Sequence, residues 1–155
     1  MKKNRIYLDN CCYNRPFDDQ TITKNHIESE TVLMIVNQCK QNNDEIIGSS
    51  ALDFEIEQIT DDNKKEKVKY FYEQTITTKI DYTDNVLKRF QELSEQTNIG
   101  TLDLLHLSLA ENSDVDALLT TDYKFEKASS KLNLKIKVIN PLQYLLEVIQ
   151  NESNY

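Results

Sequence analysis

The stretch Ile6-Tyr7-Leu8-Asp9 decides how the rest of the chain is interpreted. Three apolar residues run directly into a carboxylate, and a short apolar run bounded by turn-prone residues is typical of a buried strand. In open α/β sheets, ligands bind at the carboxyl ends of the strands. We therefore expect Asp9 to lie at the ligand-binding edge of a sheet. The next residues, 10–17, show no clear helical period and are predicted to form a loop.

Length and composition predict one soluble globular domain. The chain has 155 residues, of which 39% are hydrophobic and 28% charged, and this is enough for a substantial core. No apolar run approaches the length of a membrane span, and the basic start of the chain is interrupted at Asp9, so we expect neither a membrane anchor nor a secretory signal. We place the domain at residues 1–150 and expect 151–155 to form a disordered tail.

The charge and the cysteines restrict the class of function. A net charge of −8 argues against a broad electrostatic grip on nucleic acid, although it allows an acidic catalytic pocket whose charge is offset by bound cations. Three cysteines are an odd number, and they lack a Cys-x-x-Cys spacing. They suit a reducing cytoplasm better than a disulfide framework.

Strand-like and helix-like segments alternate along the chain. After the first strand, apolar runs predict strands at 46–49, 77–82, 117–120 and 135–139. Helical spacing and capping residues predict helices at 23–40, 50–60, 64–74, 84–96, 102–112 and 123–131, and a last one that begins at Pro141. This alternation favours right-handed crossovers, and so an α/β fold with about five mostly parallel strands and helices on both faces.

Four carboxylates are expected to meet at one edge of this sheet. Asp9 and Asp122 directly follow predicted strands, whereas Glu55 and Asp103 lie in the early turns of predicted helices. Converged carboxylates repel one another unless a cation neutralises them, and hard oxygen ligands suit Mg²⁺ or Mn²⁺. Structural roles are the alternative for two of them, because the helix dipole favours Asp103 and because Asp122 is a natural N-cap.

The same segments, in this order, resemble those of the PIN-domain nucleases. They are Ile6-Tyr7-Leu8-Asp9-Asn10, residues 49–55, residues 101–110 and residues 116–122, followed by Asn140-Pro141 before the last helix. The resemblance extends from about residue 5 to 148. It implies a single PIN-like domain with a five-stranded parallel sheet and a metal-dependent acidic site. The catalytic residues and ligands of Mg²⁺ or Mn²⁺ would then be Asp9, Glu55, Asp103 and Asp122.

The resemblance also implies an activity and partners. PIN-domain nucleases cleave RNA, here by in-line attack on phosphorus that leaves a 5′-phosphate and a 3′-hydroxyl. Many are cytoplasmic toxins paired with an antitoxin and many are homodimers, so RNA, an antitoxin and a second copy are the expected partners. The helix at 23–40 also carries more apolar residues than one buried face needs. We expect Asn10, Arg15 and Thr121 to contact the substrate, Arg15 through a phosphate.

Several alternatives compete with this interpretation. The fold could serve as a catalytically inactive module that binds RNA or protein, but all four carboxylates are present. A receiver-type phospho-acceptor would need paired acids after the first strand, and a haloacid-dehalogenase-type site would need an aspartate where Cys11 stands. A zinc site would recruit His106 with Cys11 or Cys12 at spacings that match no structural zinc pattern, so His106 is interpreted as a buried packing residue. The lysines at 124, 127, 131, 135 and 137 either contact phosphates or form a solvated surface.

Overall fold

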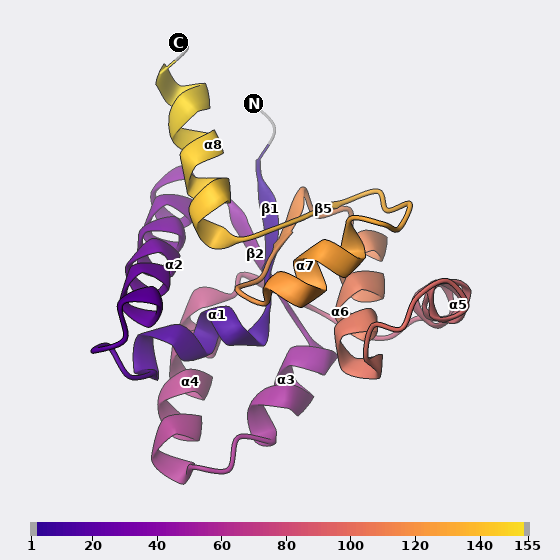
Figure 1. Ribbon diagram of the computed structural model, residues 1–155, viewed down its shortest axis with the longest axis horizontal. Coiled ribbons are helices and arrows are strands. Elements are labelled where there is room, and N and C mark those ends of the chain that lie inside the picture. The colour runs from indigo at the N-terminus through magenta and orange to yellow at the C-terminus, as the bar shows by residue number, and fades with distance from the viewer. Residues whose placement is uncertain (1–2, 154–155) are drawn as a thin grey trace.

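Five parallel strands form the centre of the computed structural model, which describes residues 3–153 (Figure 1). The strands are β1 (Arg5–Leu8), β2 (Glu45–Ser49), β3 (Thr78–Ile80), β4 (Ala117–Leu119) and β5 (Lys137–Ile139). They form one sheet in the order β3-β2-β1-β4-β5, and every neighbouring pair is parallel. The prediction of a five-stranded, mostly parallel α/β sheet is confirmed.

The chain changes direction across the sheet at β1. From β1 it proceeds outward through β2 to β3, and it then returns to the other side of β1 to form β4 and β5. Ile6 consequently has a partner on each side, Ile46 in β2 and Ala117 in β4. Such a reversal of strand order opens a crevice at the carboxyl ends of the two diverging strands, and ligands of open α/β sheets bind there. Asp9 and Asp122 follow these two strands.

The helices cover both faces of the sheet. In chain order they are α1 (Asn10–Asn14), the 3₁₀ helix η1 (Arg15–Phe17), α2 (Thr23–Asn42), α3 (Ser50–Glu57), α4 (Asp62–Thr75), α5 (Asp84–Ser94), α6 (Thr101–Asn112), α7 (Tyr123–Ser129) and α8 (Pro141–Ser153). Helices α1, α2, α4 and α8 form one packed group, and α5 packs against α6 on the other side of the sheet (Figure 1). Within residues 3–153, no helix combines the length and the hydropathy that crossing a membrane requires.

The central strand is covered on both sides. Ile6, Tyr7 and Leu8 are all fully buried although successive side chains of a strand point to opposite faces. Parallel sheets lie between two layers of helices, and their central strands are therefore continuously apolar. The first apolar run of the sequence is thus the centre of the core, and it holds Asp9 at a fixed position.

The main correction concerns the residues after Asp9. The predicted loop at 10–17 is wrong, because this segment forms α1 and η1. The Asp9 side chain caps α1 by accepting a hydrogen bond from the Asn10 N–H. A helix of five residues is too short to show a hydrophobic period, so the N-cap was the only available signal.

Smaller differences affect element ends. Ser49, one residue before the predicted helix start at residue 50, caps α3 by accepting from the Leu52 N–H. Helix α6 begins at Thr101, one residue before its predicted start at 102, and Gly100 is its N-cap. Helix α8 runs to Ser153, beyond the predicted domain end at 150, and residues 154–155 of the predicted tail lie outside the described part of the chain.

Candidate functional site

The four predicted carboxylates line one cavity at the carboxyl ends of β1 and β4. The cavity has a volume of about 480 Å³, and Asp9, Glu55, Asp103 and Asp122 all contribute to its wall. They come from four elements: the end of β1, α3, the first turn of α6 and the N-cap of α7. The parallel sheet thus brings together side chains that are far apart in the sequence.

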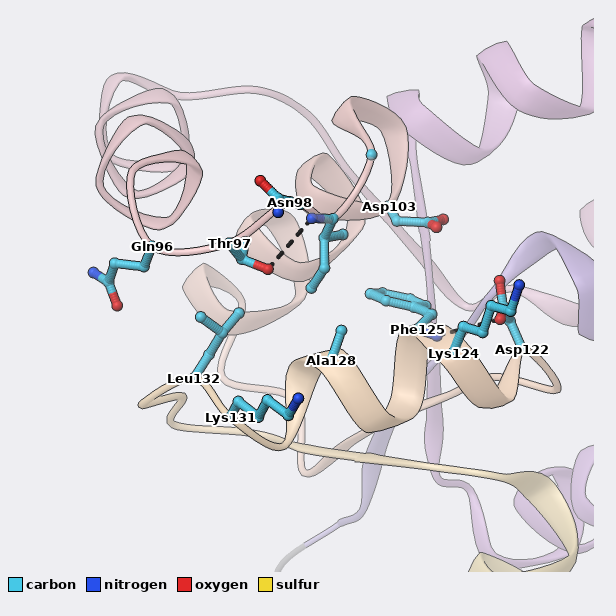
Figure 2. A pocket seen from close by; sticks show the side chains of 12 residues that line it. Gln96, Thr97, Asn98, Asp103, Asp122, Lys124, Phe125, Ala128, Lys131 and Leu132 are labelled. Atoms are coloured by element: carbon cyan, nitrogen blue, oxygen red, sulfur yellow. Dashed lines mark hydrogen bonds between the residues drawn. The ribbon is translucent and has the colours of Figure 1, made fainter.

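Asp103 and Asp122 form the side of the site next to α7. Both also lie at one end of a second pocket, of about 420 Å³, which Figure 2 shows from close by. Asp122 caps α7 through Oδ1, which accepts a hydrogen bond of 3.2 Å from the Phe125 N–H. Its other oxygen has no hydrogen-bond partner among the described residues, so Asp122 can act as a cap and as a ligand at once.

Asp103 has no hydrogen-bond donor within residues 3–153. It is half-buried, and burial together with the negative charge of Asp9 raises its pKa to about 6. Glu55 and Asp122 raise this pKa further, while His106 lowers it. The protein therefore holds Asp103 in a field of like charges, and hydrogen bonds do not offset the repulsion.

Asp9 is held much more firmly. The residue is nearly fully buried, at 5% exposure. Oδ1 accepts from the Asn10 N–H at 2.8 Å, and Oδ2 accepts from Thr120 Oγ1 at 2.8 Å and from Cys11 Sγ at 3.5 Å. Burial raises the pKa of Asp9, His106 opposes this rise and Glu55 adds to it. The Asp9 carboxylate is thus held in one position by hydrogen bonds, although burial disfavours its ionised form.

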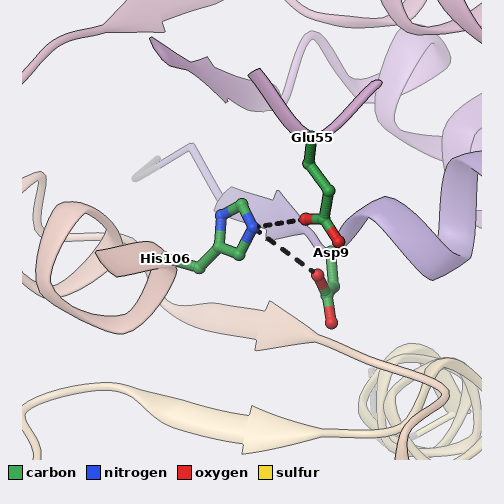
Figure 3. Close-up of side chains that lie close together, drawn as sticks. All are labelled: Asp9, Glu55 and His106. Atoms are coloured by element: carbon green, nitrogen blue, oxygen red, sulfur yellow. Dashed lines mark hydrogen bonds and ion pairs between the residues drawn. The ribbon is translucent and has the colours of Figure 1, made fainter. Parts of the chain in front are cut away.

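A closer set within this site includes a residue that the sequence analysis assigned to packing. Potential ligand atoms of Asp9, Glu55 and His106 all lie within 4.8 Å of one another (Figure 3). His106 Nε2 lies 2.7 Å from Glu55 Oε1 and 4.0 Å from Asp9 Oδ1. His106 is fully buried, as predicted, but it faces the acidic site. The only sequence signal was its position three residues after Asp103, on the same side of α6.

His106 is in turn held from behind. Its Nδ1 lies 2.6 Å from the Tyr7 hydroxyl, which lies 2.6 Å from Ser49 Oγ. Burial alone would lower the pKa of His106, but its hydrogen bond with Glu55 and the negative charges of Asp9 and Glu55 raise it above the ordinary value. The strand residue Tyr7 therefore connects the cap of α3 with the imidazole that orients Glu55.

This donor set fits a hard divalent cation. Carboxylate oxygens are the ligands that Mg²⁺ and Mn²⁺ prefer, and the His106 imidazole is engaged with Glu55. Burial is the main cause of the raised pKa values of Asp9 and Asp103, and neighbouring carboxylates raise both of them further. The cysteines of the zinc alternative do not join the close set, and Cys12 Sγ instead donates to the Leu119 carbonyl at 3.4 Å.

The three predicted substrate contacts occupy different environments. Asn10 lines the 480 Å³ cavity. Arg15 also lines it, but its guanidinium pairs with Glu28 and Asp18, each at 2.7 Å. Thr121 is buried and contributes to neither cavity, and its Oγ1 lacks a hydrogen-bond partner among the described residues. Their roles toward a substrate stay predictions.

The segment around Arg15 has a structural role instead. Asp18 accepts hydrogen bonds from Arg15 and from Lys64 Nζ, the latter at 2.6 Å, and so connects η1 with α4. Burial alone would raise the pKa of Asp18, but these two cations hold it below its ordinary value. Arg15 and Lys64 are thus neutralised on this side of the cavity.

Comparisons with known proteins agree with the fold. A family model described as the PIN domain matches residues 21–131, a range that includes Glu55, Asp103 and Asp122 but begins after Asp9. The structure is similar to the crystal structure of VapBC2 from Rickettsia felis bound to a DNA fragment from their promoter, with a TM-score of 0.56 and 15% identity over 88% of this chain and 98% of that chain. No curated protein matches the sequence.

Proposed function

Because the chain belongs to the PIN-domain family, we propose that it is an endoribonuclease that depends on Mg²⁺ or Mn²⁺. The observation that carries this proposal is the convergence of Asp9, Glu55, Asp103 and Asp122 on one cavity. The two cations that line the same cavity, Arg15 and Lys64, are already paired with other acids. A divalent cation is the group that would balance the remaining negative charge.

Each residue has a role in this proposal. Asp9 and Glu55 hold the metal ion from the β1 side, and Asp103 and Asp122 complete the site from the α7 side. A bound divalent ion lowers the pKa of a water and stabilises charge on a phosphodiester. His106 orients Glu55, and the Asn10 N–H and Thr120 hydroxyl orient Asp9. These contacts keep the ligands in place before substrate arrives.

Cleavage of single-stranded RNA of mixed sequence tests the proposal. We expect cleavage with Mn²⁺ or Mg²⁺, none with EDTA, and products with 5′-phosphate and 3′-hydroxyl ends. Glu55→Gln, purified in the same way, should lose the activity and so exclude a contaminating nuclease. Intact RNA at every metal concentration would end the nuclease proposal. Binding of RNA without cleavage would favour the alternative of an inactive binding module.

We also propose that the protein is the toxin of a toxin–antitoxin pair and acts in the cytoplasm. The family membership and the likeness to VapBC2 support the first part. The second part rests on Cys11, Cys12 and Cys39, which are all free thiols, as a reducing compartment favours.

Self-association is a further part of this proposal. Helices α2 and α8 pack together and expose Ile27 and Met34 on α2, and Leu142 and Leu146 on α8, at 45–55%. Ile27 and Leu142 line one largely apolar hollow between the two helices, and exposed apolar surface of this kind is typical of interaction sites. We expect a dimer in sedimentation equilibrium, and Met34→Lys should shift it toward monomer. Leu87→Lys, at an equally exposed position on α5, is the matched control, and a monomeric parent protein at high micromolar concentration would contradict the prediction.

A further inference from the structure

The pocket on the α7 side of the acidic site has a chemistry of its own. It has a volume of about 420 Å³, within the range of about 300–1,000 Å³ that is typical of ligand sites. Asp103 and Asp122 lie at one end, and the pocket extends from them between the segment that precedes α6 and helix α7 (Figure 2). A ligand in this pocket would therefore begin at the proposed metal site and point away from it.

Two lysines on the wall of this pocket are free to bind an anion. Lys124 lies on α7 and Lys131 follows it, and both are exposed. Neither forms an ion pair with any residue of the range 3–153. On the opposite side of the acidic site, Arg15 and Lys64 are both paired with Asp18. Around the four carboxylates, the cations available for phosphate groups are thus those of the α7 pocket.

The remaining wall of the pocket suits a nucleobase. Ile99 and Leu132 provide partly buried apolar surface, and Ala128 adds a small apolar side chain on the α7 wall. The side-chain amide of Asn98 is exposed and makes no hydrogen bond to a described residue. An amide offers both a donor and an acceptor, which is what the polar edge of a base requires. A nucleotide combines these features: an apolar ring face, a polar ring edge and a phosphate.

We propose that this pocket binds the nucleotide of single-stranded RNA that adjoins the scissile phosphate. Its base lies against Ile99 and Leu132 with its edge toward Asn98, and Lys124 and Lys131 contact the adjacent phosphates. This inference rests on the proposed nuclease function and gives the RNA a direction across the site, toward α7. It requires a single strand, because a base can enter such a pocket only when it is unstacked.

The salt dependence of RNA binding tests the lysine contacts. For single strands, each phosphate that a protein neutralises contributes about −0.7 to the slope of log K against log salt concentration. Lys124→Ala and Lys131→Ala should therefore each reduce the magnitude of the slope by about 0.7, and the double variant by about 1.4. The probe is a fluorescein-labelled RNA of mixed sequence, measured by anisotropy in the Asp9→Asn background with Mn²⁺ so that the RNA stays intact.

Lys127→Ala is the matched control. Lys127 lies on the same helix and carries the same charge, but it does not line the pocket. Its removal should leave the slope within error of the parent value. In one outcome, the parent protein cleaves RNA while Lys124→Ala, Lys131→Ala and Lys127→Ala all give the same salt slope. That result overturns the pocket inference, and the nuclease proposal stands. Lysine-dependent binding without cleavage by the parent would instead end the nuclease proposal, and with it the assignment of the pocket to a nucleotide beside a scissile phosphate, and would leave the lysines as contacts of an RNA-binding module.

A substitution that fills the pocket tests the base contact separately. Ala128→Phe places a ring where the base is proposed to lie, at a half-buried position of α7 that lines the pocket. The distribution of cleavage sites in a random RNA pool should lose its preference at the position next to the cut. Thermal melting confirms that the variant is folded. An unchanged preference in a folded variant would overturn the assignment of the base to this pocket.

Discussion

Asp103→Asn is expected to raise the thermal stability of the metal-free protein at pH 7 and to abolish RNA cleavage. Asparagine keeps the size of the side chain but removes one charge from a group of repelling carboxylates. Asp103 has no hydrogen bond to lose among the described residues, so only its attraction to His106 and to the dipole of α6 opposes the relief of repulsion. Because solvent screens a half-buried group, we expect a gain on the order of 1 kcal/mol, or about 2–4 °C in melting temperature for a domain of this size.

The pH dependence of this gain has a definite sign. The pKa of Asp103 is about 6 in the folded protein and has an ordinary value of 3.8, so the folded state binds the proton more tightly than the unfolded state. The ionised carboxylate therefore costs stability above pH 6, and this cost disappears below about pH 4. The difference in melting temperature between Asp103→Asn and the parent protein, both in EDTA, should shrink over the same range.

An exposed acid provides the control for this experiment. Glu66→Gln on α4 removes the same charge at an exposed position and should change the melting temperature little at any pH. With Mn²⁺ present, the order of stability should reverse, because the parent protein binds the cation with one more charged ligand. A variant that is less stable than the parent in EDTA would show that Asp103 supports the fold and would contradict the metal-site model.

The second large effect is expected for His106→Ala. The imidazole holds Glu55 through Nε2 and is itself held by Tyr7, which is the arrangement of a residue that orients a metal ligand. Loss of such an orienting partner typically costs about 10–100-fold in metal affinity or activity. Isothermal titration with Mn²⁺ measures the affinity directly, and RNA cleavage measures the activity below the melting temperature of the variant.

Two further variants separate orientation from packing. His106→Gln keeps an N–H at the end of the side chain that can reach Glu55, and it should restore part of the Mn²⁺ affinity. Tyr7→Phe removes only the hydroxyl between His106 and Ser49, and should cause a smaller loss of affinity than His106→Ala. If His106→Ala melts at a lower temperature but binds Mn²⁺ as the parent does, His106 is a packing residue, as the sequence alone indicated.

The parts of the fold that local patterns determine could be predicted. The apolar runs before Asp9 and before Asp122 identified β1 and β4, and their place in an alternating α/β pattern predicted that the two carboxylates would share an edge. Helix α1 was missed because five residues do not reveal a period, although Asp9 is a recognisable N-cap. Element ends shifted by up to three residues, as at the end of α3.

The contacts within the site depend on tertiary pairing, which one sequence does not display. Arg15 stands close to Asp9 in the sequence, but its partner Glu28 arrives from α2 and neutralises it. His106 resembled any core histidine until Tyr7 and Glu55 were placed on either side of it. The lysines near Asp122 formed one cluster in the sequence, and only the fold separates Lys124 and Lys131 from Lys127.

The reversal of strand order at β1 has a consequence for how the protein is synthesised. Asp9 emerges from the ribosome early, but β4, the strand that pairs with β1 on its other side and carries Asp122 at its end, emerges late. A nascent chain that ends before β4 includes the segments of β1, β2 and β3. It lacks Asp122, and therefore one of the four carboxylates of the acidic site. If the proposed nuclease function holds, the four-carboxylate site cannot be assembled until the segment that carries Asp122 has been synthesised.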